Sequence, residues 1–174
     1  MGVKVDFSEL KQFAKDIDRL NRMQREQFFE ETTRHLGDYL RVLAISRTPV
    51  GEGQKDGEGR TIRQGGALHR GWTASTANQA ITGGGLRTSH ANGAVERTKR
   101  GYYRTIVKNQ MHYASYVEYG HRQEPGRYVP AIGKRLTASW VEGQFFLRRS
   151  EDELREAAPR LIELKLDAFL KRVF

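Results

Sequence analysis

Apolar residues recur at helical spacing along the first quarter of the chain. Asp6 and Glu9 stand three residues apart just ahead of this series, which is typical of a helix start. The apolar positions then follow every three or four residues with one weaker stretch near Asn21: Phe7, Leu10, Ala14, Ile17, Leu20, Phe28, Phe29, Thr32, Leu36, Leu40 and Leu43. The spacing predicts one long helix or two consecutive helices over residues 8–46. Pro49 ends the pattern, because proline disfavours helical geometry at the preceding residue.

The end of the chain shows the same periodicity. Ser150 and Glu153 match a capping box and predict the start of a last helix. Its apolar face is expected to contain Leu154, Ala157, Leu161, Leu164 and Ala168. Pro159 lies too far inside for the first turn, so we expect a kink there or a second helix that begins near it.

Between the two helical regions, β-branched and aromatic residues alternate with polar ones. This pattern predicts strands over residues 72–77, 102–109 and 143–149, with a short strand over 94–97 that pairs with 102–109. Two glycine-rich stretches, 51–66 and 82–93, are predicted to be flexible loops.

The stretch "YASYVEYG" (113–120) is better described as a short helix, with Gly120 as a left-handed C-terminal cap. The fold class is therefore α+β. It combines a long N-terminal helix, a small, mostly antiparallel sheet with long loops, a short tyrosine-rich helix, and a C-terminal helix packed on the sheet. At 174 residues, the chain is expected to form a single domain over 1–174.

The amino-acid composition excludes several classes of functional site and of protein. The chain has no cysteine, which removes disulfides, thiolate metal sites and cysteine nucleophiles. The sequence contains neither an apolar run long enough to span a membrane nor a signal-peptide core at the N-terminus. We therefore expect a protein that is made in a cytosol and has no membrane partner.

The net charge of +9 is concentrated in the middle of the chain. Residues 51–110 carry 10 Lys/Arg against 4 acids, and residues 111–149 carry 6 against 3. Such an excess attracts phosphate backbones or acidic protein surfaces, although a solvated loop that aids solubility explains it equally well. The candidate contacts for DNA or an acidic partner are Arg97, Lys99, Arg100, Arg104 and Lys108.

Candidate chemistry is sparse. His112 and His121 flank Glu118, so a hydrolase can be imagined, but no nucleophile, second carboxylate or oxyanion motif accompanies them. The five histidines show no metal-ligand spacing, and the glycine-rich loops match no phosphate-binding motif. We therefore predict no catalytic residue, no metal and no cofactor.

The tyrosines of the middle region allow two interpretations. Tyr102, Tyr103 and the 113/116/119 set could stack on nucleic-acid bases, flanked by Arg104, Lys108 and Arg122. The helical spacing of Tyr113, Tyr116 and Tyr119 favours packing instead, in the core or against a neighbouring subunit.

A resemblance to a known protein family extends over roughly residues 28–172. It rests on three stretches in this order: "SRTPVGEG…GGALHRGW", "YASYVEYGHR" and "VEGQFFLRRSEDELREAAPRLIELKLDAFL". They resemble the neck or tail-completion (head–tail joining) proteins of long-tailed bacteriophages and prophages. Residues 51–64 and 76–100 are longer than that family's pattern, so contacts specific to these loops cannot be carried over.

The resemblance implies a structural virion protein, made in the bacterial host cytoplasm. It implies a homo-hexameric ring at the head-proximal end of the tail, between the head connector and the tail terminator or tail tube, with a channel for DNA. The residues expected at subunit interfaces are Trp72, Tyr116, Tyr119, His121, Arg122, Arg127, Phe145 and Phe146. A non-specific DNA-binding accessory protein and a hydrolase using His112, Glu118 and His121 are the alternatives.

Overall fold

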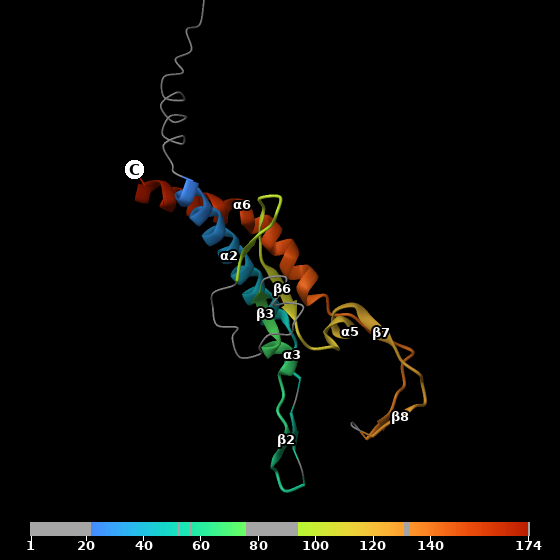
Figure 1. Ribbon diagram of the computed structural model, residues 1–174. Helices are drawn as coiled ribbons and strands as arrows, with labels where there is room; N and C mark the ends of the chain where they lie inside the picture. Colours follow the sequence, from blue (N-terminus) through green and yellow to red (C-terminus); the bar gives the residue numbers. More distant parts are fainter. Residues whose placement is uncertain (1–21, 52, 56, 76–93, 131–132, 174) are drawn as a thin grey trace, which may run out of the picture.

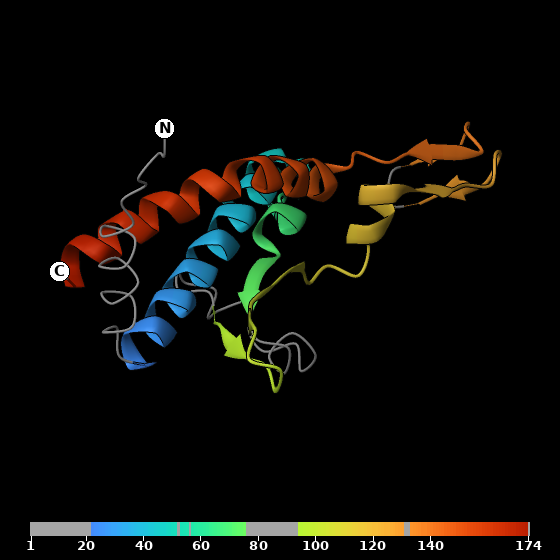
Figure 2. The same cartoon turned by 90° about the horizontal axis from the view of Figure 1, so that it is seen from above.

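The computed structural model describes residues 22–51, 53–55, 57–75, 94–130 and 133–173, and its fold is α+β, as predicted. Two long helices, α2 (Arg22–Arg47) and α6 (Phe146–Val173), lie side by side and form most of the body (Figures 1 and 2). Short antiparallel strand pairs and two small helices lie beside this helix pair and beyond its lower end (Figure 1).

Helix α2 ends where the proline predicts. The backbone N–H of Thr48 donates to the Ala44 carbonyl at 3.0 Å, and the Thr48 hydroxyl donates to the same oxygen at 2.6 Å. Together these bonds satisfy a carbonyl that the end of a helix leaves without an intrahelical partner. Residues 8–21 of the predicted helix lie outside the described part of the chain.

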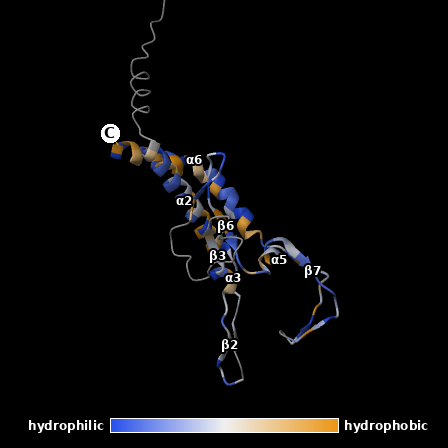
Figure 3. Cartoon of the chain, in the orientation of Figure 1, coloured by the Kyte–Doolittle hydropathy of each residue, from blue (hydrophilic) through white to orange (hydrophobic). Residues whose placement is uncertain are grey.

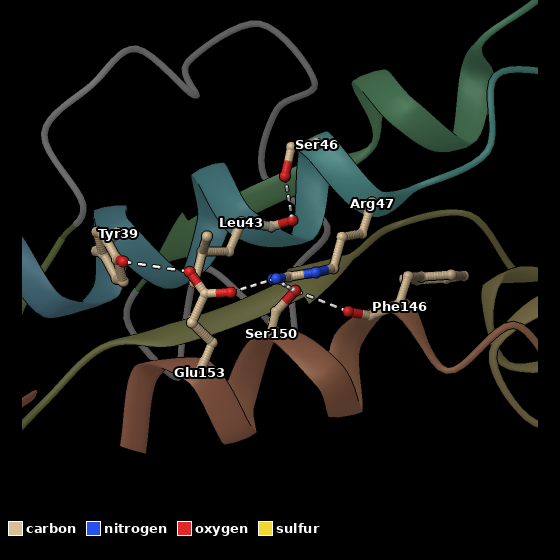
Figure 4. Close-up of polar contacts among 7 residues, drawn as sticks. All are labelled: Tyr39, Leu43, Ser46, Arg47, Phe146, Ser150 and Glu153. Carbon is tan, nitrogen blue, oxygen red and sulfur yellow. Dashed lines mark hydrogen bonds and ion pairs between the residues drawn. The ribbon is translucent and has the colours of Figure 1, made fainter. Parts of the chain in front are cut away.

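A polar network joins α2 to α6 (Figure 4). The Arg47 guanidinium donates to Ser150 Oγ at 3.2 Å and forms an ion pair with Glu153, which also accepts from the Tyr39 hydroxyl at 3.4 Å. Ser150 Oγ in turn donates to the Phe146 carbonyl at 2.7 Å. The predicted capping box of Ser150 and Glu153 is therefore wrong, because both residues lie inside α6 and serve contacts between the helices.

The predicted strand over 143–149 is also wrong, because α6 already begins at Phe146. Helix α6 continues through Pro159 as one element, so the expectation of a second helix starting there is not met. Proline removes one backbone bond, but Pro159 is exposed, where water can satisfy the freed carbonyl. The predicted apolar face is correct for the half-buried Leu154, Ala157 and Leu161, whereas Leu164 and Ala168 are exposed.

The strand pairs of the body agree with the sequence predictions. Strand β3 (Trp72–Ser75) pairs antiparallel with β6 (Ile106–Asn109), and β4 (Glu96–Arg97) pairs antiparallel with β5 (Tyr103–Arg104). Each pair is a separate two-stranded ladder, so the expected small sheet is divided.

The core lies where the helices and β3 meet. Its buried members are Ala44, Leu68, Trp72 and Phe146, with Leu68 supplied by the short helix α3 (Ala67–Arg70). The rings of Trp72 and Phe146 pack edge to face at 5.8 Å between centroids, and Trp72 Nε1 donates to Thr48 Oγ1 at 2.7 Å. A buried indole N–H is therefore satisfied in the way that a stable core requires.

Within the predicted loop 51–66, the described residues 53–55 and 57–66 form a hairpin. Strand β1 (Gln54–Lys55) pairs with β2 (Thr61–Arg63), and the Gly66 N–H donates to the Gly51 carbonyl at 3.0 Å to close the base. The hairpin projects from the body and is largely hydrophilic (Figures 1 and 3). Turn residues such as Gly59, at φ 81°, make this shape possible. The other predicted loop, 82–93, lies outside the described residues.

We expect limited proteolysis of the isolated subunit to cut first within the β1–β2 hairpin. An isolated two-stranded hairpin is marginally stable, and this one has few apolar side chains to anchor it. Trypsin has sites at Lys55, Arg60 and Arg63, and mass spectrometry of the first fragments identifies the cut. First cleavage within 113–119 or 154–168 would contradict this expectation.

Candidate functional site

The three sequence stretches that carry the phage resemblance meet in one place. Thr48 comes from the first stretch, Val117 from the second and Phe146 from the third, and Trp72 contacts both Thr48 and Phe146. Trp72 and Phe146 are each only 2% exposed. They therefore form the core of the subunit, and the prediction that they lie at an interface edge is corrected.

The junction between the tyrosine helix and α6 depends on a buried carboxylate. Glu118 belongs to α5 (Ala114–Tyr119) and is 3% exposed. Its Oε2 accepts from the Leu147 backbone N–H and its Oε1 from that of Arg148, both at 3.0 Å. These are two of the N–H groups that the start of α6 leaves unpaired, and a negative charge there also complements the helix dipole. Glu118 is thus the N-terminal cap of a helix that is distant in sequence.

Two glycines allow this junction to close. Gly120 has φ 84° and ψ 172°, so it turns the chain out of α5 in a conformation open only to glycine, and not in the predicted left-handed helical one. A Cβ on Gly120 would lie 2.5 Å from the Val141 carbonyl oxygen, and one on Gly143 would collide with the Glu118 carbonyl. The chain then docks back on α5, because the Gln144 N–H donates to the Val117 carbonyl at 2.9 Å.

The tyrosines of α5 divide between core and surface. Tyr113 packs against the core, whereas Tyr116 and Tyr119 are 56% and 61% exposed. Core packing is therefore wrong for Tyr116 and Tyr119, and replacing either with alanine is not expected to cost the few kcal/mol of a buried ring. Their apolar area remains available to a neighbouring molecule.

After α5 the chain forms a projecting arm, residues 120–130 and 133–142, that the sequence patterns did not predict. Strand β7 (Gly120–Arg122) pairs with β10 (Trp140–Glu142), and β8 (Tyr128–Val129) pairs with β9 (Lys134–Arg135). Both views show the arm extending away from the helical body (Figures 1 and 2). The Pro125-Gly126 turn and Gly133 are the sequence signals that could have indicated it.

The arm contains a cleft of about 690 Å³. We call it the arm cleft; its basic lining comes from His121, Arg122 and Arg127, and its apolar lining includes Tyr128, Val129 and Leu136. Arg122 and Arg127 are exposed, and within the described part of the chain no ion pair involves either of them. Three of the predicted interface residues, His121, Arg122 and Arg127, are thus brought together.

Two of the five residues of the predicted basic cluster in the middle region have acidic partners. Arg97 forms an ion pair with Glu26 at 2.7 Å, and Arg104 donates from Nε to Glu96 at 2.8 Å. Lys99 and Arg100 lie exposed in the turn between β4 and β5, and Lys108 lies on β6. Tyr103, a candidate for base stacking, instead stacks on Phe29 at 5.9 Å.

In the structure, the carboxylate of the hydrolase hypothesis, Glu118, is already used to cap α6. Both Glu118 oxygens accept hydrogen bonds from the α6 backbone. His112 is exposed and packs edge to face on Tyr113, whereas His121 lies beside Tyr116, so the two histidines have different neighbours. In the described ranges, no group of three or more His, Asp and Glu residues is arranged to hold a metal ion, and no helix is long and apolar enough to cross a membrane.

Comparison with known proteins gives one family. The family model carries the description "Bacteriophage HK97-gp10, putative tail-component" and matches residues 11–120, which is more than half of the chain. The match ends at Gly120, where the arm begins. Neither a curated protein nor a solved structure matches the chain. The chain belongs to the HK97-gp10-like family of bacteriophage tail components, and its place is therefore in the virion.

Proposed function

We propose that this tail component forms a homo-hexameric ring at the head-proximal end of the tail, joins the tail to the head and leaves a channel for DNA. The observation that best supports a role in assembly is the arm. It extends away from the core (Figure 2) and leaves Tyr128 53% and Trp140 44% exposed. Exposed aromatic residues of this kind are typical of surfaces that another protein covers.

A ring requires a heterologous interface, in which one surface of a subunit meets a different surface of the next. A projecting arm fits this requirement because it can reach beyond the body of its own subunit. The residues that we place at interfaces fall into two sets: Tyr116, Tyr119 and Phe145 between neighbouring subunits, and His121, Arg122 and Arg127 towards another protein of the particle. Trp72 and Phe146 are no longer in this set, since they are buried in the core. The head connector and the tail terminator or tail tube are the proposed neighbours.

Native mass spectrometry of the purified protein tests the ring. We expect a species of six copies, alone or after addition of isolated tails. A variant in which Tyr116 and Tyr119 are both alanine should keep its melting temperature but form less of the ring, because these exposed rings contribute area to the interface and little to the fold. A protein that stays monomeric under both conditions would argue against the proposal.

Binding of free DNA is the second candidate function, and we expect it to be weak at physiological salt. Arg97 and Arg104 already have acidic partners, which leaves few free cations for phosphates in the predicted cluster. Fluorescence anisotropy with a labelled duplex over a salt series measures this. If Lys99 and Arg100 contacted DNA, replacing both with alanine would reduce the salt slope by about 2. A steep slope that falls in this variant would favour the accessory DNA-binding alternative.

A further inference from the structure

We propose that the arm cleft binds an acidic, partly apolar polypeptide segment of a different protein of the particle. The inference rests on the proposed assembly function and deepens it, because it assigns a chemistry to the partner.

The two arginines of the cleft form no ion pair with the described residues. Arg122 and Arg127 are exposed, and Glu124 is the one acid among the described residues that line the cleft. His121 Nδ1 is buried there and has no hydrogen-bond partner among the described residues. An arginine guanidinium presents a planar fork that matches a carboxylate, so this side of the cleft is suited to Asp or Glu side chains.

The other side of the cleft is apolar. Tyr128, Val129 and Leu136 line it, and about half of the Tyr128 surface is accessible. A cleft of about 690 Å³ is in the range that accommodates a small ligand or a few side chains. Such a lining favours a peptide that carries apolar as well as acidic residues over a nucleic-acid duplex, whose phosphate backbone would find no partner on the apolar side chains.

A second copy of this chain is a poor source of the acidic segment. The chain carries a net charge of +9. Its 21 acidic residues include six glutamates that have cationic partners in their own subunit: Glu26 with Arg97, Glu30 with Arg34, Glu31 with Arg172, Glu58 with Arg60, Glu96 with Arg104, and Glu153 with Arg47. Charge complementarity therefore points to a different, acidic protein.

The arm holds the cleft in shape before binding. Arg135 donates to the Gly126 carbonyl at 2.7 Å, and the Leu136 N–H donates to the Arg127 carbonyl at 2.8 Å. The Gln123 N–H also donates to the Ser139 carbonyl at 2.9 Å, which ties the two sides of the arm together. A preformed site loses less conformational entropy on binding than a loop that must first be ordered.

The test uses the full chain and three labelled probes: a short peptide of alternating Glu and Tyr, the same peptide with Ser in place of Tyr, and a DNA duplex. Anisotropy titrations compare the wild type with Arg122→Glu/Arg127→Glu. The matched control is Arg149→Glu/Arg160→Glu, which makes the same charge change at exposed positions of α6. We expect the arm variant to bind the Glu-Tyr peptide at least about tenfold more weakly, and the control less than about twofold. The Glu-Ser peptide should bind the wild type more weakly than the Glu-Tyr peptide.

Two results would overturn the proposal. An equal loss in both variants would mean that the peptide responds only to net charge, and tighter, arm-dependent binding of the duplex would make the cleft a nucleic-acid site. Light scattering on the same samples measures whether the ring forms, so the cleft assignment and the ring proposal can be tested independently. If the wild type binds the peptide through the arm but forms no ring, the ring proposal fails and the cleft assignment stands. If a ring forms without arm-dependent peptide binding, the cleft assignment fails and the ring proposal stands.

Discussion

Replacing Glu118 with alanine is expected to lower the free energy of unfolding by about 3 kcal/mol, because two backbone N–H groups at the start of α6 lose a buried, charged acceptor. For a chain of this length, the melting temperature should fall by roughly 10 °C. Thermal unfolding followed by circular dichroism, together with urea titration, measures both quantities. The loss should not depend on any partner, since the cap lies within the subunit.

Two further variants test the assignment of Glu118 as a cap. Glu118→Gln keeps the shape and one acceptor but removes the charge, so its loss should lie between those of the wild type and the alanine variant. Glu142→Ala removes an exposed carboxylate from β10, next to the same junction, and should change stability by less than about 0.5 kcal/mol. Equal stability of Glu118→Ala and Glu142→Ala would show that the carboxylate does not stabilise α6.

The second large effect is expected in particle assembly. Reversing charge with Arg122→Glu/Arg127→Glu should leave the subunit folded, because both side chains are exposed and such changes rarely cost more than about 0.5 kcal/mol. The same variant should block the joining of tails to filled heads, because like charges facing an acidic partner cost several kcal/mol. Complementation of a phage that lacks the native protein, scored as infectious titre and by electron microscopy of unjoined heads and tails, measures the effect.

The control in the same assay is Arg149→Glu/Arg160→Glu, which is expected to support near-normal titres. Normal infectious particles from the arm variant would remove Arg122 and Arg127 from the interface. Loss of titre together with a lower melting temperature would instead indicate a folding defect. A hydrolytic activity abolished by His112→Ala would overturn the structural role as a whole.

The elements that could be predicted from the sequence are those whose stability is local. The apolar period of 28–43 and Pro49 predicted the course and end of α2, and β-branched alternation predicted β3 and the β4–β5 pair. The failures share one cause. Ser150 and Glu153 have the spacing of a capping box, but tertiary contacts with Arg47 use them inside α6. The helix can begin earlier because Glu118 caps it from a distant part of the chain.

In the candidate site, too, the sequence predicted what is local, and tertiary contacts decided the rest. The sequence indicated that His121, Arg122 and Arg127 follow the tyrosine helix at an exposed edge, and the structure places them in one cleft. The sequence could not indicate that Trp72 and Phe146 are buried, because an aromatic residue in a predicted short strand has the same local pattern in a core and at an interface. Nor could it pair Arg97 with Glu26, which lie far apart in sequence.

The sequence by itself determined the α+β class, the course of α2, the absence of cysteine chemistry and the relation to phage tail proteins. Each follows from local periodicity, composition or ordered motifs. Only the tertiary structure decided what those motifs do. Glu118 became a helix cap and not a candidate base, Tyr116 and Tyr119 remained exposed, and residues 120–130 and 133–142 formed an arm. The reason is that hydrogen bonds and burial between distant segments, such as Glu118 with Leu147, decide these roles, and one-dimensional spacing does not contain them.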